Sequence, residues 1–523
     1  MKIKQNLSTA SVARTAIFLV VLAELLLLYT PSAWAVPSYS RRYGVDCGNC
    51  HTMWGALNVK GATFKLSGYR AIAGKDIKPV SEDISIGKET AIPTTLPLSF
   101  VTGVGYEYRK EKREVIGAGG SSITSKGSSL ALEDASIFLT SPLGPHLSAF
   151  VEFPMYETRA WEFTPTGNYE ARYNTTPGRQ IQFSTESPTF EVAKFFWNNP
   201  LGDSTPRDSF NLLGGITHPP LAYSPGKVRL SVNQYLIYER NALELISPRK
   251  ISDSMVPGNS NDFFFRLSEP QVLAEVYGML TFAKPVTDVG QKETFWAEYH
   301  LGLTNGSNAK ADNNTQKDLY GRWVMRWYNQ SLGLFAYHSP NTYGDNLRTT
   351  ASAGTNVVSG TGIMSGSQDP NKATRIGPDF TLSLAPYGIP VSLDNQLMWN
   401  RESDPTGFGK EFKWHGGFHQ LNWAYSKTSV AYLRYDWVKG DAFDDTRSTV
   451  NGVIGITRST PKENDIIVGW QHLYDQNIKL VAEYRHHRFE DSATGGVIPT
   501  LGVATNEAHL TDNGFTIRAM FGF

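Results

Sequence analysis

From about Leu96 onward, apolar and polar residues alternate with a period of two in many segments of the chain. In the first of these segments Leu98, Val104 and Tyr106 have one parity, and Ser99 has the other. Such alternation predicts a β-strand with one apolar and one polar face. Comparable segments recur around positions 323, 391 and 431, so we expect a mainly β chain.

Alternation alone fits a soluble β-sandwich as well as a membrane barrel. Three further features favour the barrel. The segments run to roughly ten residues or more, and aromatic residues such as Tyr106, Trp296 and Tyr435 stand near their ends. Short turns such as 426–428 also alternate with long polar loops such as 340–373. Outer-membrane barrels have strands of this length, aromatic girdles, and short turns on one side only.

The end of the chain supports the same architecture. We expect about 16 antiparallel strands, since closed single-chain barrels use even numbers, with the region 225–260 the least strand-like. The predicted outer-membrane β-barrel covers 91–523, lies among the lipids of the bacterial outer membrane, and encloses an aqueous lumen unless something fills it. A terminal aromatic residue on the last strand resembles the assembly signal of such barrels, and here the alternating apolar residues are Phe515, Ile517, Ala519, Phe521 and Phe523.

Residues 1–35 have the features of a signal peptide. Basic residues up to Arg14 precede a mostly apolar stretch at 16–29, and an A-x-A motif ends at Ala35. The apolar stretch is shorter than the ~20 residues that a spanning helix needs, which disfavours a membrane anchor. We therefore expect an exported mature chain that starts near Val36.

Composition argues against a nucleic-acid partner and agrees with a mainly β chain. The chain has 49 Lys plus Arg and 49 Asp plus Glu, so its net charge is near zero and does not favour a nucleic-acid partner. Its 47 Gly, 12% aromatic residues and only 19% charged residues are typical of many strands and turns.

The two cysteines of the chain form the motif C-x-x-C-H at Cys47–His51. This pattern attaches a c-type haem, so we predict one covalently bound haem c. Cys47 and Cys50 would form the thioether links, and His51 would be the proximal ligand of the haem iron. A thioredoxin-like pair would need a βαβ context, and a closed zinc site about four ligands; the sequence shows neither.

The expected haem-bearing segment is 36–90, a small unit of helices and loops. About 50 residues bury little surface on their own, so a cofactor or surrounding protein must stabilise them. Trp54, Leu57 and Phe64 are candidates to pack against the porphyrin. No long linker separates this segment from the barrel, so we expect it to plug the lumen.

The segment Val36–Arg70 resembles the N-terminus of the fused monohaem cytochrome–porins of iron-oxidising bacteria. The resemblance rests on Arg41–Gly44, on the motif at Cys47–His51, and on an F-K-x-x-G-Y step at Phe64–Tyr69. That family often has a proline-rich step after the histidine, whereas this chain has Thr52–Leu57 there. The barrel matches the family in architecture and length only.

The resemblance implies an outer-membrane electron-transfer protein that acts as an iron oxidase. Electrons would pass from extracellular Fe(II) through the haem to a periplasmic c-type cytochrome or another carrier. Three alternatives stay open: an outward conduit to an extracellular acceptor, a solute porin with a haem-containing plug, and a soluble periplasmic β-protein with a haem tail.

Other possible metal ligands are more typical of ordinary wall and loop positions. His300 and His487 have the predicted lumen-facing parity of a barrel wall. His486 and His487 are adjacent in a strand and therefore face opposite sides, which argues against a shared ion. One long loop carries the acidic residues Asp441, Asp444 and Asp445, more simply explained by solvation than by ferrous-ion access.

Overall fold

The predicted signal peptide 1–35 lies outside the residues that the computed structural model describes, as do Cys47, Trp54, Asp444, Asp445 and Phe523. The described residues are 38–45, 50–53, 56–70, 79–88, 90–116, 121–157, 192–223, 231–242, 245, 266–283, 295–306, 315–327, 329–342, 370–405, 410–443, 449–450, 453–454, 460–475, 477–491, 496–498, 503–505 and 507–522.

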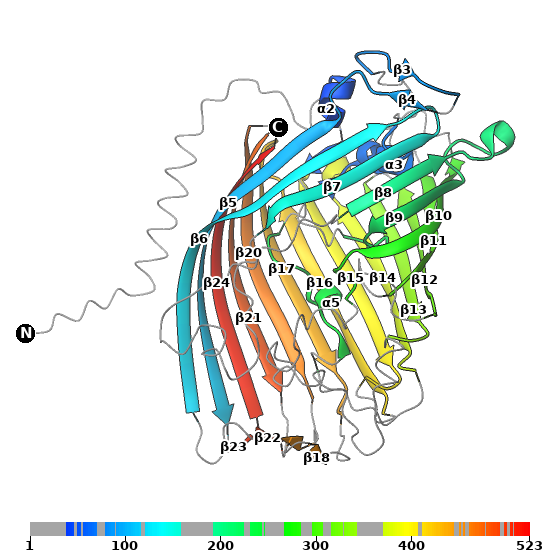
Figure 1. The fold of residues 1–523 in the computed structure, drawn as a ribbon. Helices are drawn as coiled ribbons and strands as arrows, with labels where there is room; N and C mark the ends of the chain where they lie inside the picture. The colour runs from blue at the N-terminus through cyan, green and yellow to red at the C-terminus, as the bar shows by residue number, and fades with distance from the viewer. Residues whose placement is uncertain are drawn as a thin grey trace, which may run out of the picture.

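Sixteen antiparallel strands form a closed barrel, as the alternating pattern predicted (Figure 1). Each strand pairs with the next barrel strand along the chain, and the last pairs with the first to close the sheet. The strands are β5 (Leu98–Ile116), β6 (Ser121–Pro142), β7 (Leu147–Glu157), β8 (Val192–Asn198), β9 (Asn211–Thr217), β10 (Gln271–Ala283), β11 (Phe295–Thr304), β12 (Asp318–Trp327), β13 (Gln330–Ser339), β14 (Ala373–Ser383), β15 (Val391–Glu402), β16 (Phe412–Trp423), β17 (Ser429–Gly440), β20 (Lys462–Asp475), β21 (Ile478–Asp491) and β24 (Glu507–Gly522).

The two ends of the barrel differ in their connections. Short turns join β12 to β13 and β16 to β17, whereas long connections such as the one from β13 to β14 lie at the opposite end. Two small hairpins lie at the long-loop end: β18 (Thr449–Val450) with β19 (Val453–Ile454), and β22 (Gly496–Ile498) with β23 (Val503–Thr505) (Figure 1). Short turns are typical of the periplasmic side, so the long loops face the cell exterior.

The outer surface of the barrel carries an apolar band. In β11, for example, Leu301 is 62% exposed and Leu303 47% exposed, while Glu298 and Thr304 are buried on the inner side. The same outward parity places Trp323 and Leu433 at the surface. A closed barrel satisfies all its backbone hydrogen bonds and can present apolar side chains to lipid. The protein is therefore a barrel of the bacterial outer membrane.

The prediction that Trp296 belongs to an aromatic girdle is wrong. It is 1% exposed and lies on the inner side of the wall, where it packs against Leu66 and Tyr277 rather than against lipid. The alternation already placed Trp296 on the side of Glu298 and His300. Tyr106 and Tyr435 do lie on the outside, 40% and 43% exposed. Two strands, β8 and β9, have seven residues each and are shorter than the pattern predicted.

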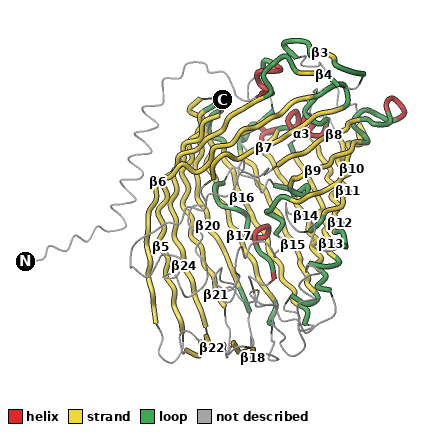
Figure 2. The backbone as a smooth tube through the Cα atoms, in the orientation of Figure 1, coloured by secondary structure: helices red, strands yellow, loops and turns green. Residues whose placement is uncertain are grey.

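The N-terminal elements gather at the short-turn end, beside the C-terminal end of β24 (Figures 1 and 2). No helix among the described residues is long and apolar enough to cross a membrane. The elements are α2 (Ser38–Tyr43), β1 (His51–Met53), β2 (Ala56–Leu57), α3 (Val59–Leu66), β3 (Ile84–Ser85) and β4 (Ala91–Ile92).

Part of the connection between β9 and β10, residues 231–242, lies inside the barrel. The described part of this connection contains the helix α5 (Leu236–Glu239) and no barrel strand, as predicted for 225–260. Two single-turn 3-10 helices, η2 (Gly202–Ser204) and η4 (Ala385–Tyr387), lie in the connections β8–β9 and β14–β15.

Candidate functional site

The described part of the C-x-x-C-H segment is fixed directly against α3. Asn58 donates its backbone N–H to the carbonyl of Cys50 at 3.0 Å, and its side chain caps α3 by accepting from the N–H of Gly61 at 2.9 Å. A Cβ at Gly61 would lie 2.1 Å from the Cys50 carbonyl oxygen, so only glycine permits this approach. His51 pairs with Leu57 in the β1–β2 hairpin.

Aromatic side chains from and around both N-terminal helices pack beside the motif. Tyr39 stacks on Tyr69 with 5.1 Å between the ring centroids and meets Phe64 edge-on at 5.2 Å. Cys50 is half-buried and packs against the buried pair of Tyr43 and Phe64. Phe64 is buried, whereas Leu57 is 43% exposed. We call this group the aromatic cluster: Tyr39, Tyr43, Phe64 and Tyr69.

The C-terminal end of α3 docks on the inner wall of the barrel. Gly68 has a φ of +64°, and its carbonyl accepts a hydrogen bond from the Ser148 hydroxyl. Asn198 and Asn211, both fully buried, each donate from Nδ2 to the carbonyl of Leu66 at 3.4 Å. Wall side chains thus satisfy carbonyls that a helix end leaves without partners.

Tyr69 inserts its ring between aromatic residues of the wall. Its centroid lies 5.6 Å from that of Phe150 on β7 and 5.5 Å from that of Phe196 on β8. The ammonium group of Lys194 lies 4.8 Å from the Phe150 centroid and 5.8 Å from that of Tyr69, within cation–π range. Tyr69 has a φ of 60°, a left-handed conformation that costs a non-glycine residue about 1–2 kcal/mol. The aromatic packing of its ring must therefore stabilise this backbone conformation.

A second apolar contact lies beneath α3. Leu66 packs in a buried group with Phe196, Tyr277, Met279 and Trp296, which come from β8, β10 and β11. Trp296 is therefore part of the surface on which the N-terminal segment docks. α3 contacts inward-facing residues of the wall at the periplasmic end.

Polar contacts tie the segment to the barrel rim. The backbone N–H of Ser38 donates to the Ser99 hydroxyl at 2.7 Å. Arg70 lies 3.7 Å from the Asp208 carboxylate, which Arg207 also approaches at 3.6 Å. Burial raises the pKa of Asp208 above its ordinary 3.8, although both arginines oppose the shift.

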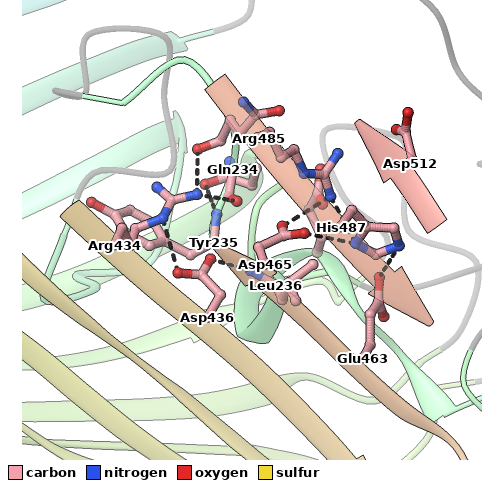
Figure 3. Close-up of polar contacts among 12 residues, drawn as sticks. Gln234, Tyr235, Leu236, Arg434, Asp436, Glu463, Asp465, Arg485, His487 and Asp512 are labelled. Carbon is pink, nitrogen blue, oxygen red and sulfur yellow. Dashed lines mark hydrogen bonds and ion pairs between the residues drawn. The ribbon is translucent and has the colours of Figure 1, made fainter. Parts of the chain in front are cut away.

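A second segment, residues 231–242, lies inside the barrel, and we call it the lumenal strap (Figure 3). Its central residues Leu236 and Tyr238 are 0% exposed. Tyr235 stacks on Phe418 of β16 with 4.2 Å between the centroids. The strap therefore has an apolar contact with the wall as well as the polar ones that follow.

Carboxylates of the wall hold both ends of the strap. Glu483 on β21 accepts from the Ser231 hydroxyl at 2.7 Å and from the Val232 N–H at 3.0 Å. Near the other end, the guanidinium of Arg240 donates to Glu463 on β20, with Nε at 2.7 Å. These carboxylates supply acceptors for backbone and side-chain donors that burial removes from bulk water.

A buried ion pair supports the middle of the strap (Figure 3). Arg434 lies 2.9 Å from Asp436, and both side chains are at most 1% exposed. Arg434 also donates to the carbonyl of Gln234 at 2.9 Å, and Asp436 accepts from the N–H of Leu236 at 3.3 Å. Loss of one partner from a buried pair is strongly destabilising, because it leaves the other charge uncompensated.

The histidines lie where the alternation placed them. His300 faces inward and contacts the Glu275 carboxylate through Nδ1 at 2.8 Å. His487 also faces inward, 2.7 Å from Asp465, while His486 contacts Asn513 at 2.8 Å on the other side of the strand. The two adjacent histidines therefore share no ion.

The predicted acidic loop gives no metal site within the described residues. Asp441 is exposed, and Asp444 and Asp445 lie outside the described ranges. In the described part of the chain, no cluster of three or more His, Cys, Asp or Glu side chains could hold a metal ion.

Sequence reasoning missed the residues that dock the two inner segments. Asn198, Asn211 and Glu483 contact residues 132 or more positions away. Inward-facing Asn side chains near a strand end were a weak signal at most, because their partner lies in another part of the chain.

The donor set fits a c-type haem. A thiol and an imidazole stand on adjacent residues, Cys50 and His51, with an aromatic cluster beside them and a glycine, Gly61, where α3 approaches. These residues would hold the group, together with Cys47, which lies outside the described residues. The haem would supply one-electron chemistry between ferric and ferrous iron.

The chain has no match among family models or curated proteins. Among solved structures, the outer-membrane channel DcaP of Acinetobacter baumannii is 9% identical, with a TM-score of 0.41 over 81% of this chain and 97% of that one. OmpT of Vibrio cholerae is 9% identical with a TM-score of 0.38, over 84% and 100%. OmpF of Salmonella typhi, in complex with daunomycin, is 10% identical with a TM-score of 0.35, over 84% and 100%. Because these TM-scores are below 0.5, the barrel assignment rests on the strand pairing alone.

Proposed function

We propose that the protein takes electrons from extracellular Fe(II) and passes them through one covalent haem c to a periplasmic c-type cytochrome or another carrier. One observation carries this proposal. The described part of the C-x-x-C-H segment belongs to a unit that docks inside the barrel at its short-turn end. A cofactor attached there would face the periplasmic carrier on one side and the lumen on the other.

Two inner segments occupy part of the lumen. α3 lies in part of the periplasmic mouth, and the lumenal strap lies along the wall from β14 to β21. An electron needs no open channel, so a partly filled lumen is compatible with electron transfer. The same two segments also fit a solute porin with an internal plug, and a conductance measurement decides between the two functions.

The proposal is tested by adding Fe(II) to the purified holoprotein while the haem spectrum is followed. The wild type is expected to show one covalent haem per chain and reduction by Fe(II). Cys50→Ala should lower the haem content, and His51→Ala should abolish a low-spin spectrum. A wild type that carries haem and stays oxidised in Fe(II), at both acidic and neutral pH, contradicts the iron-oxidase assignment.

A second candidate, a solute porin with an internal plug, is favoured by the polar inner wall and by the strand number. Barrels of 16 strands enclose aqueous channels in porins, and inward-facing Arg322, Asp379 and Glu298 line this one. Planar-bilayer recordings separate the two candidates. Stable conductance of the haem-loaded wild type would favour the porin, and a closed barrel would favour the electron conduit. The haem reduction potential separates an outward conduit, which passes electrons to an extracellular acceptor, from the inward conduit proposed here.

A further inference from the structure

A row of ring side chains follows the inner wall away from the docked segment. Phe196 lies 5.5 Å from Tyr69 and 6.3 Å from Tyr277, measured between ring centroids. His300 then stacks on Tyr277 at 5.8 Å with an angle of 8° between the rings. We call the following residues the lumenal row: Tyr69, Phe196, Tyr277, His300, Tyr320 and Tyr337.

One carboxylate joins the two halves of the row. Glu275 contacts His300 Nδ1 through Oε1 at 2.8 Å and accepts from the Tyr320 hydroxyl through Oε2 at 2.8 Å. Tyr320 is the cross-strand partner of Tyr337 between β12 and β13. Cross-strand partners have Cβ atoms only about 5 Å apart, and both residues belong to one buried cluster.

A glycine makes room for the row. Gly302 lies between Glu275 and Tyr320 in the register of β10, β11 and β12. A Cβ at Gly302 would lie 2.2 Å from Cζ of Tyr320, so the Tyr320 ring lies directly over the backbone of β11. Any larger residue at 302 would force this ring out of the row.

The row crosses the tilted strands from the short-turn end of β8, where Phe196 lies, to the long-loop end of β12 and β13. At the periplasmic end, Tyr69 belongs to the aromatic cluster that packs against Cys50. At the long-loop end, Tyr337 donates to Asp318, the first residue of β12. Phe196, Tyr277, Tyr320 and Tyr337 are each at most 4% exposed, whereas Tyr69 and His300 are half-buried.

We infer that the lumenal row is the electronic bridge between the extracellular mouth and the haem. This inference rests on the proposed function and adds its route. One electron leaves the external donor, which is oxidised from Fe(II) to Fe(III), and reaches the ferric haem, which becomes ferrous. No proton or other group is transferred in net. The rings divide the distance into steps between neighbouring π systems.

Tyr320 is the position at which to test the bridge, because its hydroxyl bonds to Glu275 on the wall rather than to the docked segment. In sealed proteoliposomes with the long loops outward, Tyr320→Leu should slow haem reduction by external Fe(II) about tenfold or more, a barrier increase of at least ~1.4 kcal/mol. Tyr320→Phe keeps the ring and should stay near the wild-type rate. Haem content and midpoint potential should not change in either variant.

Phe412→Leu is the matched control. Phe412 is 1% exposed at the long-loop end of β16, and its ring partner is Phe443, outside the row. This variant should keep the wild-type rate. Equal rates for Tyr320→Leu and wild type would overturn the bridge and leave the proposed function intact. No reduction of the wild-type haem would overturn both.

A haem-free measurement tests the row independently. In the Cys47→Ala/Cys50→Ala chain, Lys317→Cys becomes the sole thiol and takes a ruthenium photo-oxidant next to Asp318. A laser flash should produce a tyrosyl radical that moves along the row and recombines slowly with the label. Tyr320→Leu should confine the radical to the label's end and shorten its lifetime severalfold. An unchanged lifetime would count against the bridge.

Discussion

Gly68 is the residue at which the docking of α3 can be tested most directly. Its φ of +64° is left-handed, and a Cβ would meet Asn198 Oδ1 at 2.2 Å. Gly68→Ala should therefore add a steric clash to a conformational cost of about 1–2 kcal/mol. We expect faster hydrogen exchange of the α3 amides, measured by mass spectrometry.

Gly202 provides the matched control for this substitution. It also has a left-handed φ, +59°, but nothing lies within 4 Å of its would-be Cβ. Gly202→Ala should carry the conformational cost alone and leave exchange of α3 unchanged. If both variants release α3 equally, or neither does, the contact with Asn198 does not hold the segment.

Asp208 should make the folded state less stable as the pH rises. Burial raises its pKa in the folded chain above the ordinary 3.8 of an unfolded chain, so the folded state binds the proton more tightly. The contribution of Asp208 to folding is thus complete below pH 3.8 and is lost as the pH rises through the raised pKa. The opening free energy of the amides that exchange only by global unfolding should fall over this interval.

Asp208→Asn removes the titrating group and should flatten that pH profile. The opening free energy follows from hydrogen-exchange rates corrected for their intrinsic pH dependence. Arg70 and Arg207, the charged neighbours of Asp208, are the same in the wild type and the variant. A wild-type profile that rises with pH, or a variant with the wild-type slope, would contradict this account of the rim.

For single residues, the side of the strand on which a side chain lies was predictable from the sequence, whereas its long-range contact partners were not. The period of two placed His300 and His487 inside because it is a local property of each strand. Trp296 shows where residue type misled: an aromatic near a strand end favours the lipid interface, yet α3 covers it. Asn198 and Glu483 meet residues far away in sequence, which no local pattern encodes.

At the element scale, the lumenal strap depends on few wall residues. Glu483→Ala removes the acceptor of Ser231, Val232 and Asn233, and each buried donor left unsatisfied costs about 1–3 kcal/mol. The start of the strap should leave the wall. In planar bilayers we expect longer or larger openings than in the wild type.

Glu411→Ala is the control for a lost carboxylate. Glu411 pairs with Arg401 and Lys413 at the end of β16, where the side chains are far more exposed. Exposed pairs contribute little, so this variant should conduct like the wild type. Unaltered conductance in Glu483→Ala would mean that the strap does not limit the pore.

The strands were predictable as elements because their alternation and turns repeat along the chain. The lumenal strap was predictable only as an interruption of that pattern at 225–260. Its position depends on Asp436 and Glu463, which also fit an ordinary water-filled lumen. Nothing in their spacing distinguishes an acceptor for a strap from a residue that lines a channel.

At the scale of the whole molecule, a membrane barrel carries two internal segments fastened to its wall. α3 contacts β7 to β11, and the hydrogen bonds of the strap reach from β14 to β21. Cys50 and His51, the described residues of the C-x-x-C-H motif, lie beside the first of these segments, at the periplasmic mouth. The proposed electron conduit depends on this arrangement.

The most direct test uses sealed proteoliposomes that hold oxidised cytochrome c inside and the holoprotein with its long loops outward. External Fe(II) should reduce the trapped cytochrome, while a small solute trapped with it stays inside. His51→Ala vesicles should show no reduction. If the solute escapes and the cytochrome stays oxidised, the protein is a solute pore and the central claim is wrong.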